Sequence, residues 1–373
     1  MAIYKSIVSK IKIPAGNKIK QKNYLPDGVL PIIDQGSEPI GGYTNDTSKQ
    51  IICKLPVIVF GDHTKNVKYI NFPFCVGAEG VKILKAHEGI SDKYLYFGTI
   101  YLTYCIEDKG YARHYQYMEK SDLSIPPLPE QERIVARIEE LFSQLDAAVA
   151  ELNTIKGKLQ IYRQAVLKEA FEETCKQKIP LRKIAITRLG KMLDKDKNKG
   201  NNHKYLRNIN VRWFKFDLSD LLEIKISDDE IERFSVKFND LLMCEGGEPG
   251  RCAVWKGENA MCFQKALHRI RFINGAIPEF YMYLFYYYAQ TGFLKSYFTG
   301  SGIKHLTGES LETVLVPDVP KNKQIILVSK IEEKLSACNS ITKTIEETLQ
   351  KTVYLRQTIL QQTFGGNVKW INT

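Results

Sequence analysis

The chain has 373 residues, a length that accommodates two or three domains of the usual size of roughly 100 to 200 residues. Its composition, with 44% hydrophobic and 25% charged residues, is that of a globular protein and excludes the fibrous and disordered classes. The 53 Lys and Arg exceed the 42 Asp and Glu, and the formal net charge of +11 favours a polyanionic partner, with nucleic acid as the first candidate.

The cysteines and the apolar runs bear on the compartment. No two of the eight cysteines have the C-x-x-C spacing that presents paired thiolates to zinc or to redox exchange, so we expect reduced core thiols, no metal site and a cytoplasmic location. The N-terminal stretch Met1–Pro14 has no apolar signal core, which argues against secretion. The most apolar run, Phe280–Ala289, is far shorter than the roughly 20 residues that span a bilayer, so we interpret it as a buried helix.

Two stretches of the chain have the pattern of a mixed α and β domain. Short runs rich in β-branched and aromatic residues, bounded by Gly, Asp and Asn, predict strands, and one longer apolar run in each stretch predicts a buried helix. In the first stretch the strands are expected at Leu55–Phe60, Val67–Phe72 and Gly80–Leu84, and the helix at Asp92–Tyr104. In the second they are expected at Asp240–Glu245, Cys252–Trp255 and Leu267–Phe272, with the helix at Pro278–Gln290.

Each domain pattern is followed by a copy of an internal repeat. Pro127–Phe171 aligns with Pro320–Phe364 without a gap, and YRQAVLKEAF at Tyr162–Phe171 matches LRQTILQQTF at Leu355–Phe364. The first copy has apolar or small residues alternately three and four apart from Ile134 to Val166, which predicts a long helix with one seam for a partner helix. The second copy keeps this register at Leu327, Ile331, Ile341, Ile345, Leu355 and Ile359, but it puts Lys334, Cys338, Thr348 and Thr352 on the seam. We therefore expect the second helix to pair with the first, forming a rod.

The joint before each helix is also repeated. The first joint reads IPPLPEQERIVARIEELF from Ile125 to Phe142, and its prolines, Pro126, Pro127 and Pro129, predict an extended stop before a helix whose acidic first turn suits the helix dipole. The second, VPKNKQ from Val319, lacks the Pro-Glu-Gln run, so we expect a differently composed surface there.

At these residues the chain resembles the specificity subunit of Type I restriction-modification systems. The helix start at Ile125–Asp146 carries the resemblance most specifically, and moderate support comes from Gly61–Thr64 with Phe72–Leu84, from Asp240–Trp255 and from Gly300–Leu311. The resemblance implies an α+β fold with an internal pseudo-two-fold repeat, in which two target-recognition domains are separated by two long helices that form an antiparallel coiled-coil rod. It predicts a first recognition domain at 1–126, a first long helix at 127–176, a second recognition domain at 177–318, a second long helix at 319–366 and a tail at 367–373.

The family also implies function and partners. It implies a non-catalytic subunit that reads a bipartite double-stranded DNA target, docks two methyltransferase subunits and, through them, joins the restriction and translocase subunits. No cofactor is expected in this chain, since S-adenosylmethionine, ATP and Mg would belong to the partner subunits, and no membrane is expected. A different class of function stays open: a coiled-coil scaffold whose globular domains bind protein or RNA.

The candidate DNA contacts are cations, which hold phosphates, and polar side chains, which reach base edges. The stretch Lys195–Lys204 is expected to be a flexible loop, either a phosphate grip or a solvated charged loop. Arg113-His114 and Lys304-His305 recur at matching places, where they meet DNA or cap the domain against its rod. His63 follows an Asp and suggests an oriented base, but no nucleophile accompanies it, so a turn or a base contact is preferred. The DNA-binding set is Lys18, Lys20, Lys22, Gln35, Ser37, His63, Thr64, Lys65, Arg113, His114, Lys197, Lys199, Arg207, Asn208, Arg251, Lys304 and His305.

The subunit-docking candidates lie on the two long helices: Glu130, Gln131, Arg133, Arg137, Arg163, Gln164, Arg356 and Gln357. No catalytic residue is expected. The chain has no Asn/Asp-Pro-Pro-aromatic loop of an adenine methyltransferase, no G-x-G-x-x-G loop and no P-loop.

Overall fold

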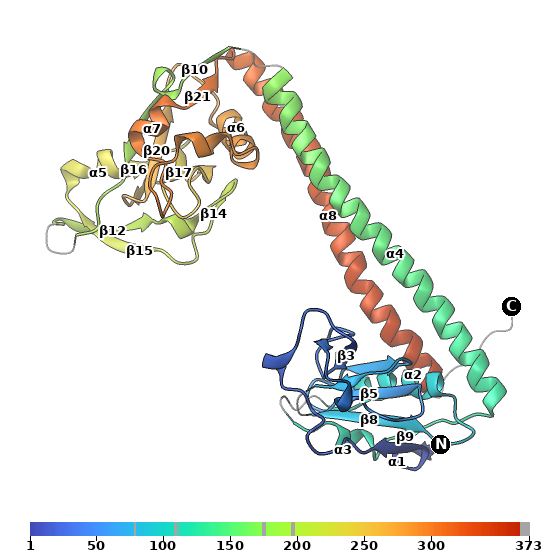
Figure 1. Cartoon of the computed structure of the whole chain (residues 1–373). Coiled ribbons are helices and arrows are strands. Elements are labelled where there is room, and N and C mark those ends of the chain that lie inside the picture. The colour runs from blue at the N-terminus through green and yellow to red at the C-terminus, as the bar shows by residue number, and fades with distance from the viewer. Residues whose placement is uncertain (78–79, 108–109, 111, 174–176, 195–197, 366–373) are drawn as a thin grey trace. The chain divides into compact units, whose positions relative to one another are not determined.

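The computed structural model describes residues 1–77, 80–107, 110, 112–173, 177–194 and 198–365. The chain divides into two compact units, of which one is Met1–Asn153 with Ile345–Thr373 and the other is Thr154–Thr344 (Figure 1). Each unit contains one α+β domain and one half of a pair of long helices, so the predicted fold class is confirmed.

The first unit is built on a four-stranded antiparallel sheet in the order β2-β8-β5-β6, formed by Val8–Ile11, Val81–Ala86, Val57–Gly61 and Val67–Ile70. A smaller sheet, β4-β3-β7, is formed by Gly42–Thr44, Leu30–Ile33 and Cys75–Val76, and β3 runs parallel to β7. Helix α2, Asp92–Cys105, packs on the main sheet. The remaining elements are short: β1 Ala2–Ile3 with β9 Asp122–Leu123, α1 Tyr4–Ile7, η1 Gln21–Asn23, η2 Thr47–Lys49 and α3 Tyr115–Met118.

The second unit repeats this topology. Its main sheet, β11-β20-β17-β18, is formed by Ala185–Leu189, Leu267–Phe272, Leu241–Cys244 and Cys252–Val254. Its other sheet, β15-β12-β19-β16, is formed by Leu222–Ile226, Asn201–Leu206, Met261–Phe263 and Ser235–Val236, and β12 runs parallel to β19. Helix α6, Pro278–Gln290, takes the place of α2. The short elements are β10 Lys178–Pro180 with β21 Leu315–Pro317, β13 Val211–Arg212 with β14 Lys215–Phe216, η4 Leu181–Lys183, η5 Asn208–Asn210, α5 Asp228–Phe234, η6 Phe293–Tyr297 and α7 Gly308–Thr313.

The central strands β5 and β17 are buried on both faces because their side chains alternate between two cores. In β5, Ile58 and Phe60 pack with α2, whereas Val57 and Val59 face the smaller sheet. In β17, Leu241 and Met243 pack with α6, and Leu242 and Cys244 belong to the other core. The predicted strands and the two buried helices are therefore confirmed, while Asn201–Lys204 belongs to β12 and not to the loop expected there.

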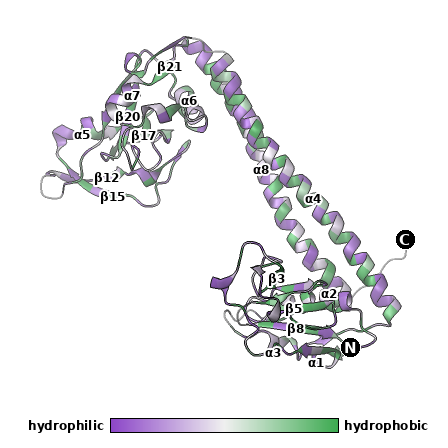
Figure 2. Ribbon diagram, in the orientation of Figure 1, coloured by the Kyte–Doolittle hydropathy of each residue, from purple (hydrophilic) through white to green (hydrophobic). Residues whose placement is uncertain are grey.

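The long helices are α4, Leu128–Lys168, which continues as the π-helical turn η3, Glu169–Glu173, and α8, Lys321–Phe364. In each unit they lie side by side and antiparallel, and polar and apolar residues alternate along both (Figures 1 and 2). The helix α4 begins at Leu128, so Pro129 lies in its first turn, where proline is tolerated, and not in the extended stop expected for it. Among the described helices, none is long and apolar enough to cross a membrane.

The predicted seam of α8 is confirmed at Cys338, Ile345 and Thr352, which are buried. It is wrong at Ile341 and Leu355, which are 45% and 48% exposed. The buried residues Ile331, Cys338, Ile345 and Thr352 are seven apart, so one position of each heptad is covered, and the other position is exposed at Ile341 and Leu355. The seam of α8 therefore passes through the polar Thr352 and leaves two apolar residues in solvent.

Candidate nucleic-acid interface

A set of polar residues converges where β5 ends. We call Gln35, Asp62, His63, Thr64 and His114 the β5-end cluster. The buried Asp62 organises it: its Oδ1 accepts a 2.8 Å hydrogen bond from the backbone N–H of Tyr115, and its carbonyl accepts from both the backbone N–H (2.8 Å) and Nδ1 (3.0 Å) of His114. Lys82 Nζ lies 3.5 Å from Asp62 Oδ2. The end of the strand is thus tied to the segment around His114.

Gln35 ties the same strand end to the smaller sheet. Its carbonyl accepts from Thr64 Oγ1 (2.6 Å) and from Asn66 Nδ2 (2.9 Å), and its Oε1 lies 3.4 Å from the backbone N of His63. His63 Nδ1 donates to the carbonyl of Ala112 at 3.1 Å. Gly80 closes the cluster, since a Cβ there would lie 2.8 Å from both the His63 ring and Gln35 Oε1, and its φ is +86°. Four residues of the predicted DNA-binding set are therefore in one place.

The second unit has a matching set where β17 ends. We call Asn208, Glu245, Gly246, Arg251 and His305 the β17-end cluster. Asn208 Nδ2 donates to the Gly246 carbonyl at 2.9 Å, and Arg251 Nη2 donates to the Asn208 carbonyl at 3.0 Å. The His305 ring covers Gly246, since a Cβ there would lie 2.9 Å from His305 Nδ1. This second cluster brings together three more residues of the predicted set.

Supporting contacts hold the β17-end cluster in place. Glu248 accepts from Arg251 Nη1 and from Trp213 Nε1, both at 2.7 Å. Leu306 follows His305 in the chain, and its backbone N–H donates to the Glu245 carbonyl at 2.8 Å. The carbonyl of Leu306 accepts a 2.8 Å hydrogen bond from Nε2 of His268. Burial lowers the pKa of His268, so its ring serves this bond in the neutral form.

The two carboxamides occupy equivalent positions, and the two histidines do not. Ile33 pairs with Val76 and Leu206 pairs with Phe263 in the parallel ladders, and Gln35 and Asn208 each follow two residues later. The backbone bond from His114 to Asp62, in contrast, is matched by the bond from Leu306 to Glu245. The predicted equivalence of Arg113-His114 and Lys304-His305 is therefore wrong by one residue. His114 is 1% exposed and supports its loop from inside, whereas His305 is exposed.

The other predicted DNA-binding residues lie on separate segments. Exposed members are Lys18, Lys20, Lys22, Ser37, Arg113, Lys199 and Lys304, while Lys65, at φ +60°, is partly buried. Arg207 forms an ion pair with Asp220, in which Nη2 of the arginine lies 2.6 Å from Oδ2 of the aspartate. Lys197 lies outside the described residues. Sequence reasoning missed Asn66, Lys82 and Trp213, because each acts through a partner that is distant in sequence.

Two of the predicted docking arginines join the helices to each other. Arg163 Nη2 donates to Asn339 (2.8 Å) and Thr342 (3.1 Å) of α8, and Arg356 pairs with Asp146 of α4. The repeat places Arg163 on Arg356 and Asp146 on Asn339, so the same contact is made once in each unit. These arginines are only partly exposed, because they stabilise the helix pair. Of the other candidates, Arg133 and Arg137 form ion pairs with Glu130 and Glu140 within α4, and Gln164 and Gln357 lie beside the two arginines.

Gln131 is not a surface residue. It is fully buried, and its side chain bonds to the backbone of Ser91, Gly89 and Pro126. This burial does not fit a docking contact. The repeat also sets Gln324 on Gln131, so the second joint has lost Pro129 and Glu130 but has kept the glutamine, contrary to the interpretation of VPKNKQ.

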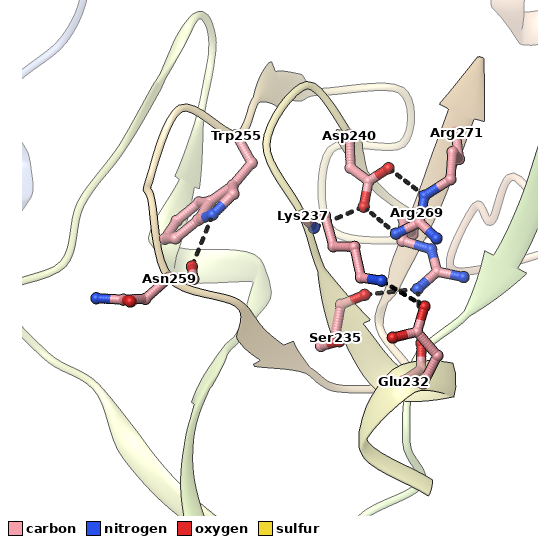
Figure 3. Close-up of polar contacts among 8 residues, drawn as sticks. All are labelled: Glu232, Ser235, Lys237, Asp240, Trp255, Asn259, Arg269 and Arg271. Atoms are coloured by element: carbon pink, nitrogen blue, oxygen red, sulfur yellow. Dashed lines mark hydrogen bonds and ion pairs between the residues drawn. The ribbon is translucent and has the colours of Figure 1, made fainter. Parts of the chain in front are cut away.

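A group of charged residues around Asp240 lies just before β17, whereas the β17-end cluster lies after that strand. Figure 3 shows the polar contacts of this group. The buried Asp240 receives two bonds from Arg271, at 2.7 and 2.6 Å, and one from the backbone N–H of Lys237 at 2.7 Å. This pairing raises the pKa of Arg271. Arg269 Nη1 donates to the Ser235 carbonyl at 2.5 Å. In the described part of the chain, no group of three His, Cys, Asp or Glu side chains is placed to hold a metal ion.

Replacing Asp240 by Ala should destabilise the second unit by about 2 to 4 kcal/mol, because the guanidinium of Arg271 and the backbone N–H of Lys237 lose their acceptor. Calorimetry should show the melting transition of this unit lowered, with the other transition unchanged. The matched control is Glu232→Ala, which removes an exposed ion pair with Lys237 and should change the melting temperature little. Equal effects of the two substitutions would contradict the assignment.

Comparisons with known proteins find similarity to one family of DNA specificity subunits. Residues 8–157 match the family model described as Type I restriction modification DNA specificity domain. The chain is 25% identical over 268 residues to the Type I restriction enzyme EcoKI specificity subunit of Escherichia coli K12, covering 66% of this chain and 58% of that protein. It is 28% identical over 177 residues to the EcoR124I/EcoR124II specificity subunit of Escherichia coli, covering 44% of this chain and 43% of that protein.

Solved structures share the fold. The HsdS subunit from Thermoanaerobacter tengcongensis superposes with a TM-score of 0.60 at 15% identity, covering 98% of this chain and 96% of that one. A second structure gives a TM-score of 0.70 at 15% identity, covering 97% of this chain and 98% of that one. It is described as "Structural basis underlying complex assembly and conformational transition of the type I R-M system". The predicted resemblance is confirmed.

Proposed function

We propose that the chain, which is similar to the specificity subunits of Type I restriction-modification systems, is the non-catalytic subunit that reads a bipartite DNA target for such a complex. The β5-end cluster would read one half of the target and the β17-end cluster the other. The aligned region spans 58% of the first relative, so the activity and partners of that protein are extended to this chain as a proposal.

The observation that carries this proposal is the occurrence of equivalent polar clusters in two domains that are both mounted on α4 and α8. Each cluster places a carboxamide, Gln35 or Asn208, at the same position beside the end of the central strand. Carboxamides pair with adenine edges and Arg251-type guanidinium groups pair with guanine edges in the major groove. The net charge of +11 supplies the attraction to phosphate that such base reading requires.

The partners in this proposal are two methyltransferase subunits, which would in turn bring restriction and translocase subunits. S-adenosylmethionine, ATP and Mg would be bound by those subunits and not by this chain. The repeat supports two docking sites, since Ile161 and Tyr162 on α4 are 69% and 46% exposed and their repeat equivalents on α8, Tyr354 and Leu355, are 71% and 48% exposed. Contiguous exposed apolar surface marks candidate sites for a protein partner, and Val353, next to Tyr354, is also exposed.

The test is an electrophoretic shift with duplex DNA, using the chain alone and in complex with a co-expressed methyltransferase. We expect weak, salt-sensitive binding by the chain alone and sequence-specific binding by the complex. A chain that ignores duplex DNA under both conditions, or that binds RNA in preference, would instead support the coiled-coil scaffold.

Each carboxamide should govern only its own half of the target. We expect Gln35→Ala to weaken discrimination in one half-site and Asn208→Ala in the other, each by about 1 to 3 kcal/mol. Binding to duplexes with single base changes, measured for the complex, would show this reciprocity. Asn202→Ala, an exposed position in β12, is the matched control and should leave both half-sites unchanged. A loss spread evenly over both half-sites would contradict the assignment.

A further inference from the structure

Two buried glutamines join each domain to its long helix in the same way. Gln131 and Gln324 are 0% and 3% exposed and occupy the first turns of α4 and α8. The backbone N–H of each bonds to Pro127 or Pro320, at 3.1 and 3.0 Å. Both residues are therefore fixed parts of the helix start.

The side-chain amides make matching contacts in the two units. Nε2 donates to the carbonyl of the residue that precedes the joint proline, Pro126 for Gln131 (2.8 Å) and Val319 for Gln324 (2.7 Å). Oε1 accepts from the backbone N–H of Ser91 for Gln131 (2.9 Å) and of Ile277 for Gln324 (2.8 Å). One side chain thus ties the end of the domain, the start of the long helix and a third segment.

In each unit, the third segment is the start of a helix that packs on the sheet bearing the β5-end or the β17-end cluster. Ser91 and Ile277 are the N-caps of α2 and α6, which pack on the sheets that contain β5 and β17. Because protein interiors are densely packed, a helix that is fixed at its N-terminus transmits its orientation to the sheet beneath it. Each glutamine is therefore placed to set the orientation of one cluster on its own long helix.

We propose that Gln131 and Gln324 are positioning residues that hold each recognition domain at a fixed angle on its long helix. With both angles fixed, the complex would discriminate between DNA targets by the number of base pairs between the half-sites. This inference rests on the proposed function. Base contacts alone would specify the half-sites. A fixed angle is needed in addition if a target with one base pair more or fewer between the half-sites is to be rejected.

The test uses Gln131→Met and Gln324→Met, which keep side-chain length but remove the donor and the acceptor. Gln144→Met, at an exposed position of α4, is the control. Hydrogen exchange followed by mass spectrometry should show exchange roughly tenfold faster at Ser91 or Ile277 in the corresponding variant, because the acceptor of that N–H is lost. If a methionine variant does not fold, Gln131→Asn serves in its place, because it keeps the amide but is too short to reach both partners.

The second measurement is the affinity of the methyltransferase complex for duplexes with the native spacer and with one base pair added or removed. We expect the variants to lose at least about tenfold of the preference for the native spacer, with half-site preference unchanged. Faster exchange with unaltered spacer preference would overturn the positioning role, and so would unaltered exchange. If the wild-type complex itself binds no bipartite duplex, the proposed function fails and this inference fails with it.

Discussion

Replacing Tyr354 and Leu355 together by aspartate is expected to prevent one methyltransferase subunit from binding, while the chain keeps its fold. Both side chains lie on α8 in solvent, beside Val353, which is 67% exposed. Burying such residues against a partner accounts for much of an interface's free energy, so two charges there should cost at least about 3 kcal/mol, or a hundredfold in affinity. Titration calorimetry of the purified subunits would measure the loss.

The repeat makes this prediction more specific. The equivalent pair is Ile161 and Tyr162, and Ile161 lines a groove of about 530 Å³ between α4 and α6, to which Tyr286 and Tyr287 also contribute. Aspartates at one pair should leave the other pair able to bind, so native mass spectrometry should find one partner copy instead of two. Ser336→Asp with Ala337→Asp, at exposed positions of α8, should leave both copies bound. Loss of both copies from a single altered pair would contradict two independent docking sites.

The sequence predicts the elements well because their signals are local. The helix Pro278–Gln290 has the bounds expected from its apolar run, and the strands around β5 and β17 lie within a few residues of their predicted positions. The repeat predicts the pairing of α4 with α8, since each lacks a partner for its seam. The seam of α8 was predicted at Cys338 and Thr352, but the exposure of Ile341 and Leu355 was not, because it depends on the particular surface that α4 presents to them.

The clusters depend on pairing between distant segments, which no local pattern encodes. Gln35 meets His63 because β3 runs parallel to β7 and thereby lies beside the end of β5. Asn208 meets Gly246 through the corresponding arrangement of β12 and β19. Gln131 illustrates the same limit: among the polar residues of an amphipathic helix start, only the contacts with Ser91 and Pro126 distinguish a buried glutamine from an exposed one.

Adding four residues to α4 after Asn153 and four to α8 after Thr348 is expected to lengthen the spacer of the DNA target by about two base pairs, because four helical residues add about 6 Å and one base pair spans about 3.4 Å. The pairs Arg356–Asp146 and Arg163–Asn339 place these two positions opposite each other in the antiparallel pair. An insertion of four residues nearly preserves a three-and-four seam, so both helices should stay folded.

The measurement is binding of the methyltransferase complex to duplexes that share both half-sites and differ only in spacer length. The optimum should shift to the longer spacer, and the half-site sequences should be unchanged, because neither cluster is altered. Four residues inserted after Glu258, in the exposed loop between β18 and β19, are the control and should leave the optimum where it is. Altered half-site sequences with an unaltered spacer would mean that α4 and α8 do not set the distance between the two readings. An altered spacer with the half-sites retained would mean that two different features determine recognition. The side chains of the two clusters would determine the base sequence of the half-sites, and the length of the helix pair would determine the number of base pairs between them.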